Sequence, residues 1–181
     1  MTVLVSPNDL VFLAKTAESC LELEGDMIEV GVYEGGTAKV ISEVKGNKKL
    51  YLFDTFEGLQ KCNPALDGLF TDGQYTASEE AVVGLLKDYK DVEVKKGWFP
   101  DSAECLKEAK ICFCHLDTDT HESTKGCLEF IYPRMVSKGI ILIHDYPGSF
   151  IGITKAVNEF FSDKTEKPQR VGEFYGMITK E

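Results

Sequence analysis

Short apolar runs alternate along this chain with longer segments in which apolar residues recur at helical spacing. The apolar runs predict strands near 26–32, 49–53, 91–96, 111–116 and 138–144. The segments at helical spacing predict a leading helix over about 8–24 and further helices near 36–45, 77–89, 101–109, 122–132 and 150–162. Strands that alternate with helices are typical of parallel strands joined by crossover helices. The pattern therefore predicts an α/β fold of the doubly wound type.

The last part of the chain and one long irregular stretch complete this expectation. The closing segment RVGEFYGMITK predicts one or two further strands, which gives a mostly parallel, seven-stranded sheet with an antiparallel edge strand. At 181 residues the chain fits one domain, residues 1–181, with an N-terminal helical segment over 1–24. Residues 55–76 show little periodicity, and long loops of this kind are often functional. We expect them to form a lid.

A glycine-rich turn follows the first predicted strand, in the stretch MIEVGVYEGGTA. Such a turn, leading into a helix, brings backbone N–H groups close to any ligand bound there. A dinucleotide fingerprint would space its glycines as GxGxxG, whereas Tyr33 and Glu34 stand between Gly31 and the Gly35–Gly36 pair. The spacing disfavours an oxidoreductase that uses NAD. By itself, the turn is also compatible with a tight strand-to-helix connection that binds nothing.

Residues beyond the glycine turn point to a nucleoside ligand. Glu29 supplies an acceptor suited to a ligand that carries an ammonium group, and Asp54 ends the next strand, where a carboxylate can bind ribose hydroxyls. Trp98 and Phe99, in KKGWFPDS, could flank an adenine ring, and packing in the core is an equally good interpretation of both aromatics.

Acidic and imidazole side chains follow two later strands, in CHLDTDTHEST and ILIHDYPG. Open α/β sheets bind ligands at the carboxyl ends of their strands, so Asp117, Asp119, His144 and Asp145 are expected to converge there. This set suits a divalent cation such as Mg²⁺ that keeps some of its waters. The alternative is structural, with Asp119 capping the next helix and Asp145 bonding a loop.

Composition narrows the partners and the compartment. The formal charge of −10 disfavours binding to nucleic acid or to an anionic membrane surface. No stretch is apolar enough to span a bilayer, and MTVLVSPNDL does not resemble a signal peptide, so a cytoplasmic location is expected. The six cysteines contain no CxxC pair and are expected to be reduced core residues. His115 and His121, each considered separately, favour a structural or solvent-facing role.

In sequence order, six blocks resemble the macrocin O-methyltransferase family. They are EVGVYEGGTA, YLFDTFEGL, KKGWFPDS, HLDTDTHEST, YPR at 132–134 and HDY at 144–146. Members of this family methylate sugar hydroxyls of macrolide antibiotics with S-adenosylmethionine and Mg²⁺. The resemblance implies a cofactor site made of Glu29, Gly31, Tyr33, Gly35, Gly36, Thr37, Asp54, Thr55, Phe56, Gly97, Trp98 and Phe99.

The expected activity is methyl transfer from S-adenosylmethionine to a hydroxyl of a small molecule, sugar-like or natural-product-like. Asp117 and Asp145, with His144, would hold Mg²⁺, and Asp119 or His121 would remove the hydroxyl proton. The sequence departs from the family where paired acids become His144–Asp145 and an apolar residue and tyrosine become Thr120–His121. The alternative is a nucleoside-binding protein without turnover that has lost its metal site. The sequence leaves a homo-oligomer open.

Overall fold

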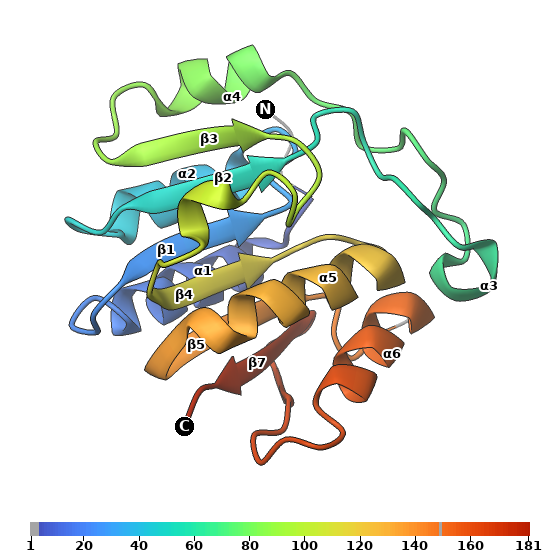
Figure 1. Ribbon diagram of the computed structural model, residues 1–181. Coiled ribbons are helices and arrows are strands. Elements are labelled where there is room, and N and C mark those ends of the chain that lie inside the picture. The colour runs from blue at the N-terminus through green and yellow to red at the C-terminus, as the bar shows by residue number, and fades with distance from the viewer. Residues whose placement is uncertain (1–3, 149) are drawn as a thin grey trace.

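The computed structural model describes residues 4–148 and 150–181, and a seven-stranded sheet forms its centre (Figure 1). The strand order is β3-β2-β1-β4-β5-β7-β6. The strands are β1 Asp26–Val30, β2 Leu50–Asp54, β3 Val92–Lys96, β4 Ile111–Leu116, β5 Met135–His144, β6 Gln169–Val171 and β7 Tyr175–Thr179. Strands β1 to β5 pair in parallel, whereas β7 runs antiparallel to β5 and β6 runs antiparallel to β7. The expected mostly parallel sheet with an antiparallel edge is confirmed.

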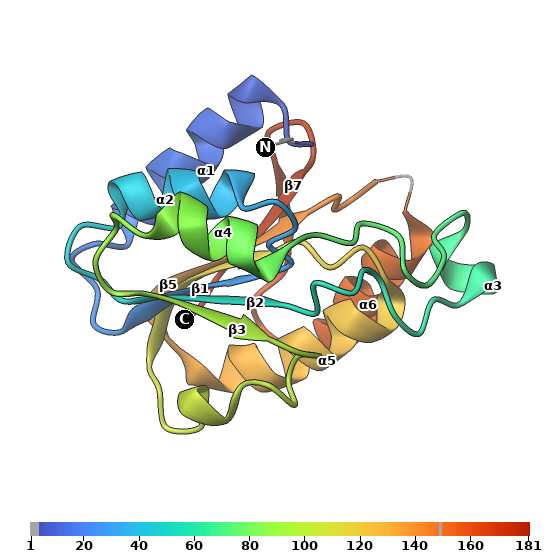
Figure 2. The same ribbon diagram turned by 90° about the horizontal axis from the view of Figure 1, so that it is seen from above.

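Helices cover both faces of this sheet. They are α1 Pro7–Ser19, α2 Gly36–Val44, α3 Pro64–Asp67, α4 Glu79–Leu86, α5 His121–Ile131 and α6 Ile151–Phe160, with 3-10 turns η1 Glu104–Leu106 and η2 Tyr132–Arg134. Figure 2 shows α1, α2 and α4 on one face and α5 and α6 on the other. This is the doubly wound arrangement that the alternating pattern predicts.

Central strand β4 shows why the apolar runs are continuous rather than alternating. All six of its residues are buried, because helices cover the sheet on both sides. One core cluster, which includes Phe53 and Leu128, packs under α5 and α6. The other, which includes Leu13 and Ile41, packs under α1 and α2. The carboxyl ends of β1, β2, β4 and β5 are thereby fixed side by side at one edge.

The structure corrects several sequence predictions. The helix expected over 101–109 is only the 3-10 turn η1, because its buried residues Ala103 and Leu106 lie three apart and are flanked by exposed polar residues. The leading helix stops at Ser19, before a turn in which Gly25 has φ +102°. Strand β5 begins at Met135, and α3 is a helical turn that the pattern does not predict.

The cysteines only partly follow the expectation of core packing. Cys20, Cys112, Cys114 and Cys127 are buried, and burial raises the pKa of each thiol. Cys105 is exposed and Cys62 is half-buried, so these two are not core residues. All six are free thiols.

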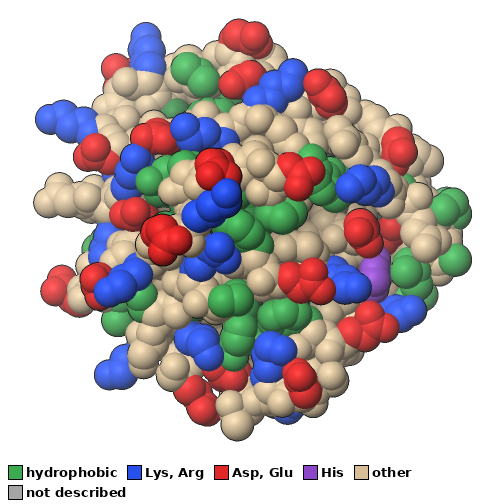
Figure 3. Space-filling model, in the orientation of Figure 1, with side chains coloured by type: hydrophobic (Ala, Val, Ile, Leu, Met, Phe, Trp, Pro, Cys, Tyr) green, Lys and Arg blue, Asp and Glu red, His purple; other side chains and the backbone are tan. Residues whose placement is uncertain are grey.

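Charges of both signs are mixed over the surface. On the face in Figure 3, lysine and arginine side chains alternate with aspartate and glutamate, and apolar side chains lie between them. Within residues 4–148 and 150–181, no helix is long and apolar enough to cross a membrane.

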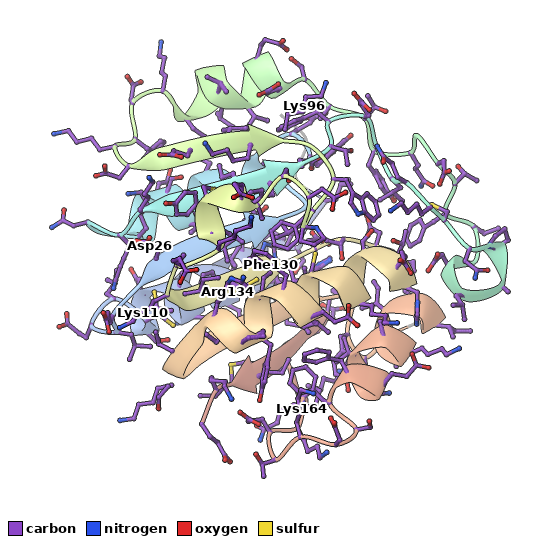
Figure 4. All side chains as sticks on the ribbon, viewed as in Figure 1. Asp26, Lys96, Lys110, Phe130, Arg134 and Lys164 are labelled. Atoms are coloured by element: carbon purple, nitrogen blue, oxygen red, sulfur yellow. The ribbon has the colours of Figure 1, made fainter. Side chains whose placement is uncertain are left out.

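The YPR block at 132–134 stabilises the fold rather than lining the site. Arg134 Nε donates to the Leu106 carbonyl at 3.0 Å, and Arg134 Nη1 donates to the Phe130 carbonyl at 2.6 Å. The guanidinium carbon lies 3.7 Å from the centroid of the Phe130 ring, and Figure 4 labels both side chains. Arg134 thus ties the end of α5 to the η1 turn.

Candidate active site

A cavity of about 310 Å³ opens at the carboxyl edge of the parallel strands. Most of the sequence-predicted site residues line it: Gly31, Tyr33, Gly36, Thr37, Asp54, Thr55, Gly97, Trp98, Phe99, Asp117, Asp119, His144 and Asp145. Four others are not on its wall: Glu29, Gly35, Phe56 and His121. The topology therefore brings together residues from five separate segments of the chain.

Gly31 forms the point where the glycine turn meets the end of β4. Its φ is +89°, and a Cβ at this position would overlap the backbone oxygen of Asp117. The Asp117 N–H donates to the Val30 carbonyl at 2.9 Å, and this hydrogen bond holds the end of β4 against the end of β1. Gly35, with φ +83°, ends the turn and precedes α2, so its role is local to the turn.

Asp54 holds the glycine turn through its carboxylate. Its Oδ2 accepts from the N–H groups of Val32 and Tyr33, each at 2.8 Å, and its Oδ1 accepts from the Phe56 N–H at 2.7 Å. Asp54 also lines the cavity, and each carboxylate oxygen can accept more than one hydrogen bond. One side chain is thus placed both to shape the turn and to contact a ligand.

Glu29 is fully buried behind the cavity wall. Its Oε1 lies 2.7 Å from His115 Nδ1, and His115 Nε2 lies 3.1 Å from the Tyr175 hydroxyl. Oε2 is buried without a hydrogen bond. Burial raises the pKa of Glu29, while His115 and Thr37 lower it. His115 is thus the structural histidine that the sequence favours, and Thr37 is the residue of this group that reaches the cavity.

The two aromatics of KKGWFPDS differ in their surroundings. Phe99 packs edge-on against Phe53 at 5.1 Å and Phe130 at 5.3 Å between ring centroids, in the core. Trp98 lies under Lys61, whose Nζ is 4.2 Å from the ring centroid. Both line the cavity, so Phe99 is a core residue that also reaches the cavity wall.

An acidic cluster lies at the other end of the cavity, at the ends of β4 and β5. Asp117, His144 and Asp145 each offer a ligand atom within 4.8 Å of the others. His144 Nδ1 lies 3.3 Å from an oxygen of Asp117 and from one of Asp145, yet it is buried without a well-aligned hydrogen bond. Asp119 and Asp145 have φ of +60° and +61°, a backbone strain that is common at functional sites.

The charges of this cluster are strongly interdependent. Burial opposes the charged form of His144, but Asp117 and Asp145 raise its pKa to about 11. His144 in turn lowers the pKa of Asp117 against the effect of burial. Burial, Asp117 and Asp145 raise the pKa of Asp119 well above its usual range. At neutral pH, the His144 imidazolium supplies the counter-charge for the Asp117 and Asp145 carboxylates.

The structure does not bring His121 into this cluster. Its Nε2 lies 3.3 Å from a carboxylate oxygen of Glu159 on α6, and its side chain is not part of the cavity wall. His121 is the first residue of α5, so its backbone N–H is free of the helix and donates to Asp67.

Several cavity residues were not predicted from the sequence. The aromatic rings of Phe70, Tyr75 and Phe150 form one wall, where Phe70 and Phe150 stack at 5.0 Å. Tyr33 meets Tyr75 edge-on at 5.8 Å. Burial and the nearby Asp119 raise the pKa of the Tyr75 hydroxyl. The aromatic content of 70–75 was the available signal within the expected lid.

Two solved structures that share the fold are methyltransferases. The O-methyltransferase NovP superposes with a TM-score of 0.82 at 19% identity, covering 98% of this chain and 81% of that one. The calicheamicin methyltransferase CalS11 also gives 0.82, at 16% identity, covering 95% and 78%. Together with a cavity at the carboxyl edge, the fold defines the class: a Rossmann-like methyltransferase fold.

The sequence comparisons give the family. The model of the macrocin-O-methyltransferase (TylF) family matches residues 13–169, so the chain belongs to that family. A tetracenomycin rhamnosyl 4'-O-methyltransferase of Streptomyces olivaceus is 28% identical over 142 residues, which cover 67% of this chain and 53% of that protein. Mycinamicin III 3''-O-methyltransferase of Micromonospora griseorubida is 27% identical over 156 residues, covering 74% and 61%. The chain spans little more than half the length of these curated relatives.

Proposed function

We propose that this protein transfers the methyl group of S-adenosylmethionine to a hydroxyl of a small molecule. The observation that carries the proposal is one cavity with a glycine turn and Asp54 at one end and an acidic cluster at the other. Family membership supports the same chemistry. An enzyme that holds donor and acceptor side by side in one cavity gains much of its rate from positioning.

The cofactor would occupy the end formed by the β1 and β2 termini. Asp54 would accept hydrogen bonds from the ribose hydroxyls, and Trp98 and Phe99 would flank the adenine. Gly31, Tyr33, Gly36 and Thr37, together with Thr55 and Gly97, would line this part of the site. Glu29 would support Thr37 from the buried side of the cavity wall. Gly35 and Phe56 would shape the turns that carry the cavity residues.

The acidic cluster suits a divalent cation, and Mg²⁺ is our proposal. Asp117 and Asp145 offer carboxylate oxygens, and the buried His144 Nδ1, which has no well-aligned hydrogen bond, would give up its proton to serve as the third ligand. Bound there, the cation would lower the pKa of the acceptor hydroxyl. Because hard Mg²⁺ prefers oxygen ligands, His144 is the weakest donor of the three.

Asp119 is the better candidate for proton acceptor. Burial, Asp117 and Asp145 raise its pKa, which makes its carboxylate a stronger base toward a hydroxyl proton than an ordinary carboxylate. As the methyl carbon leaves sulfur and bonds to oxygen, the hydroxyl proton would pass to Asp119. His144 is less suited to serve as a metal-free base, because its neighbours keep it protonated at neutral pH. His121 does not line the cavity, and its imidazole lies against Glu159.

The acceptor would lie between the acidic cluster and the aromatic wall, beneath residues 55–76 acting as a lid. Excluding water would protect the reactive sulfonium during transfer. The relatives are named for acceptors with a rhamnosyl group, a novobiocin scaffold or a mycinamicin scaffold. We therefore propose a sugar or natural-product hydroxyl as the acceptor.

Two measurements test this function. Calorimetry with S-adenosylhomocysteine should show one binding site, and Asp54→Ala should weaken it. Incubation with S-adenosylmethionine, Mg²⁺ and a panel of glycosides should release S-adenosylhomocysteine and give a product heavier by one methylene. Binding without any product across the panel would favour the alternative of a nucleoside-binding protein without turnover.

A further inference from the structure

Asp67 lies in the middle of the 55–76 segment and yet is buried, with 5% of its surface exposed. Its Oδ2 accepts from the Asn63 N–H at 2.7 Å, within the segment. Its Oδ1 accepts from the His121 N–H at 2.8 Å, at the start of α5. This carboxylate therefore joins the expected lid to the body of the protein, together with the ring contacts of Phe70 with Phe150 and of Tyr75 with Tyr33.

A third element completes this junction. A Cβ at Gly152, in the first turn of α6, would overlap Asp67 Oδ1 and would lie 3.2 Å from the His121 nitrogen. Figures 1 and 2 both show α3 beside the start of α6, away from the sheet. Glycine at 152 thus leaves the space that the Asp67 carboxylate needs.

The two helices at this junction, α5 and α6, each follow a residue of the acidic cluster in the sequence. Helix α5 begins two residues after Asp119, and α6 begins six residues after Asp145. The 55–76 segment itself is closed at its base, where the Leu59 N–H donates to the Gln74 carbonyl at 2.7 Å and the Gly73 N–H donates to the Leu59 carbonyl at 2.8 Å. Because its base is closed, the segment can move as a unit.

We propose that Asp67 is a latch that holds residues 55–76 over the acceptor end of the cavity. When the His121 N–H and the Asp67 carboxylate are bonded, Leu59, Phe70 and Tyr75 form the cavity wall. When the latch is broken, the segment swings out from its base and the acidic cluster becomes open to water. Asp67 is a positioning residue, and its consequence for methyl transfer rests on the proposed function.

Trypsin provides a test that needs no ligand. Lys61 is the one basic residue between 55 and 76, so cleavage after it reports opening of this segment. Well below the melting temperature, Asp67→Ala should raise the rate of this cleavage about tenfold or more. Glu57→Ala is the matched control, because it removes an exposed carboxylate of the same segment that pairs with Lys96 at 3.3 Å, away from the Lys61–Cys62 bond and from α5, and it should stay within about twofold of wild type.

Gly152→Ala tests the latch from the opposite side. Alanine favours a helix more than glycine does, so α6 itself should not weaken, while the added methyl displaces the Asp67 carboxylate. The variant should therefore raise Lys61 cleavage as Asp67→Ala does. The double variant should be cleaved no faster than the faster single variant, because both changes open one contact.

Trp98, the only tryptophan, gives a second readout through its contact with Lys61. Acrylamide should quench its fluorescence more strongly in Asp67→Ala than in Glu57→Ala. Wild-type cleavage and quenching in Asp67→Ala would overturn the latch, as would equal acceleration by Glu57→Ala. Failure of S-adenosylhomocysteine to bind wild type would instead count against the proposed function, and the comparison of cleavage rates would still decide the latch.

Discussion

The two ends of the cavity are built in different ways. At the proposed cofactor end, one carboxylate, Asp54, accepts three backbone N–H groups from two adjacent turns. At the proposed acceptor end, Asp117, His144 and Asp145 hold one another by charge. The Asp54 end is held in place by hydrogen bonds to the main chain. At the other end, the protonated His144 balances the charge of the two carboxylates.

We expect this difference to separate binding of the cofactor from the methyl-transfer step. A turn held by the main chain keeps its shape whether or not a ligand is present, which favours a preformed cofactor site. A cluster whose charges depend on one another responds to a proton, a cation or an acceptor hydroxyl. We expect substitutions at the two ends to divide accordingly, between affinity for the cofactor and turnover.

The largest expected effect is that of Asp145→Ala on turnover. Loss of this carboxylate removes a proposed cation ligand next to the acceptor, and methyl transfer should fall about 10²- to 10³-fold. Affinity for S-adenosylhomocysteine, measured by calorimetry, should change little. Chelation with EDTA should act on wild type in the same way, and Mg²⁺ should restore it. Full turnover after exhaustive chelation would remove the metal from the mechanism.

Gly31→Ala should break the contact between the two ends. The added methyl would overlap the Asp117 backbone oxygen, and alanine is strained at φ +89°. The free energy of unfolding should fall by about 2–4 kcal/mol, as measured in urea. Gly84→Ala is the control, because no atom lies within 4 Å of a Cβ there. Equal stabilities of the two variants would contradict the tight approach of the turn to β4.

Asp54→Ala should weaken binding of S-adenosylhomocysteine by about 1–3 kcal/mol, because the N–H groups of the turn lose their acceptor and the ribose loses a partner. Asp54→Asn keeps the size of the side chain, but its amide nitrogen cannot accept a hydrogen bond from these N–H groups, so affinity should fall here too. Calorimetry on folded variants gives both values. Unchanged affinity in both would place Asp54 outside the cofactor site.

The smallest expected effect is at the buried thiols. Cys114 has no hydrogen-bond partner among the described contacts, so Cys114→Ser should cost about 1–2 kcal/mol of stability with little loss of cofactor affinity. Cys112→Ser should cost less, because its side chain already lies 3.4 Å from the Asp26 carbonyl. Thermal unfolding measures both. A folded cysteine variant without cofactor affinity would contradict their assignment to the core.

The sequence by itself determined the sheet, its antiparallel edge and about half of the residues that line the cavity. Apolar runs such as 111–116 coincide with their strand because burial on both faces requires continuous apolar residues. Asp54, Asp117 and Asp145 were predictable because each ends a strand, and parallel strands end at one edge.

Only the tertiary structure decided which of these residues share a contact and what surrounds them. His121 and Asp119 are two positions apart, yet a helix start turns one toward Glu159 and a strained backbone leaves the other on the cavity wall. Asp67 carries no signal in the sequence, because its role depends on the space at Gly152 and on the free N–H of His121. Local pattern specifies which residues are buried and where strands end, whereas partners distant in the chain are set by how the helices pack.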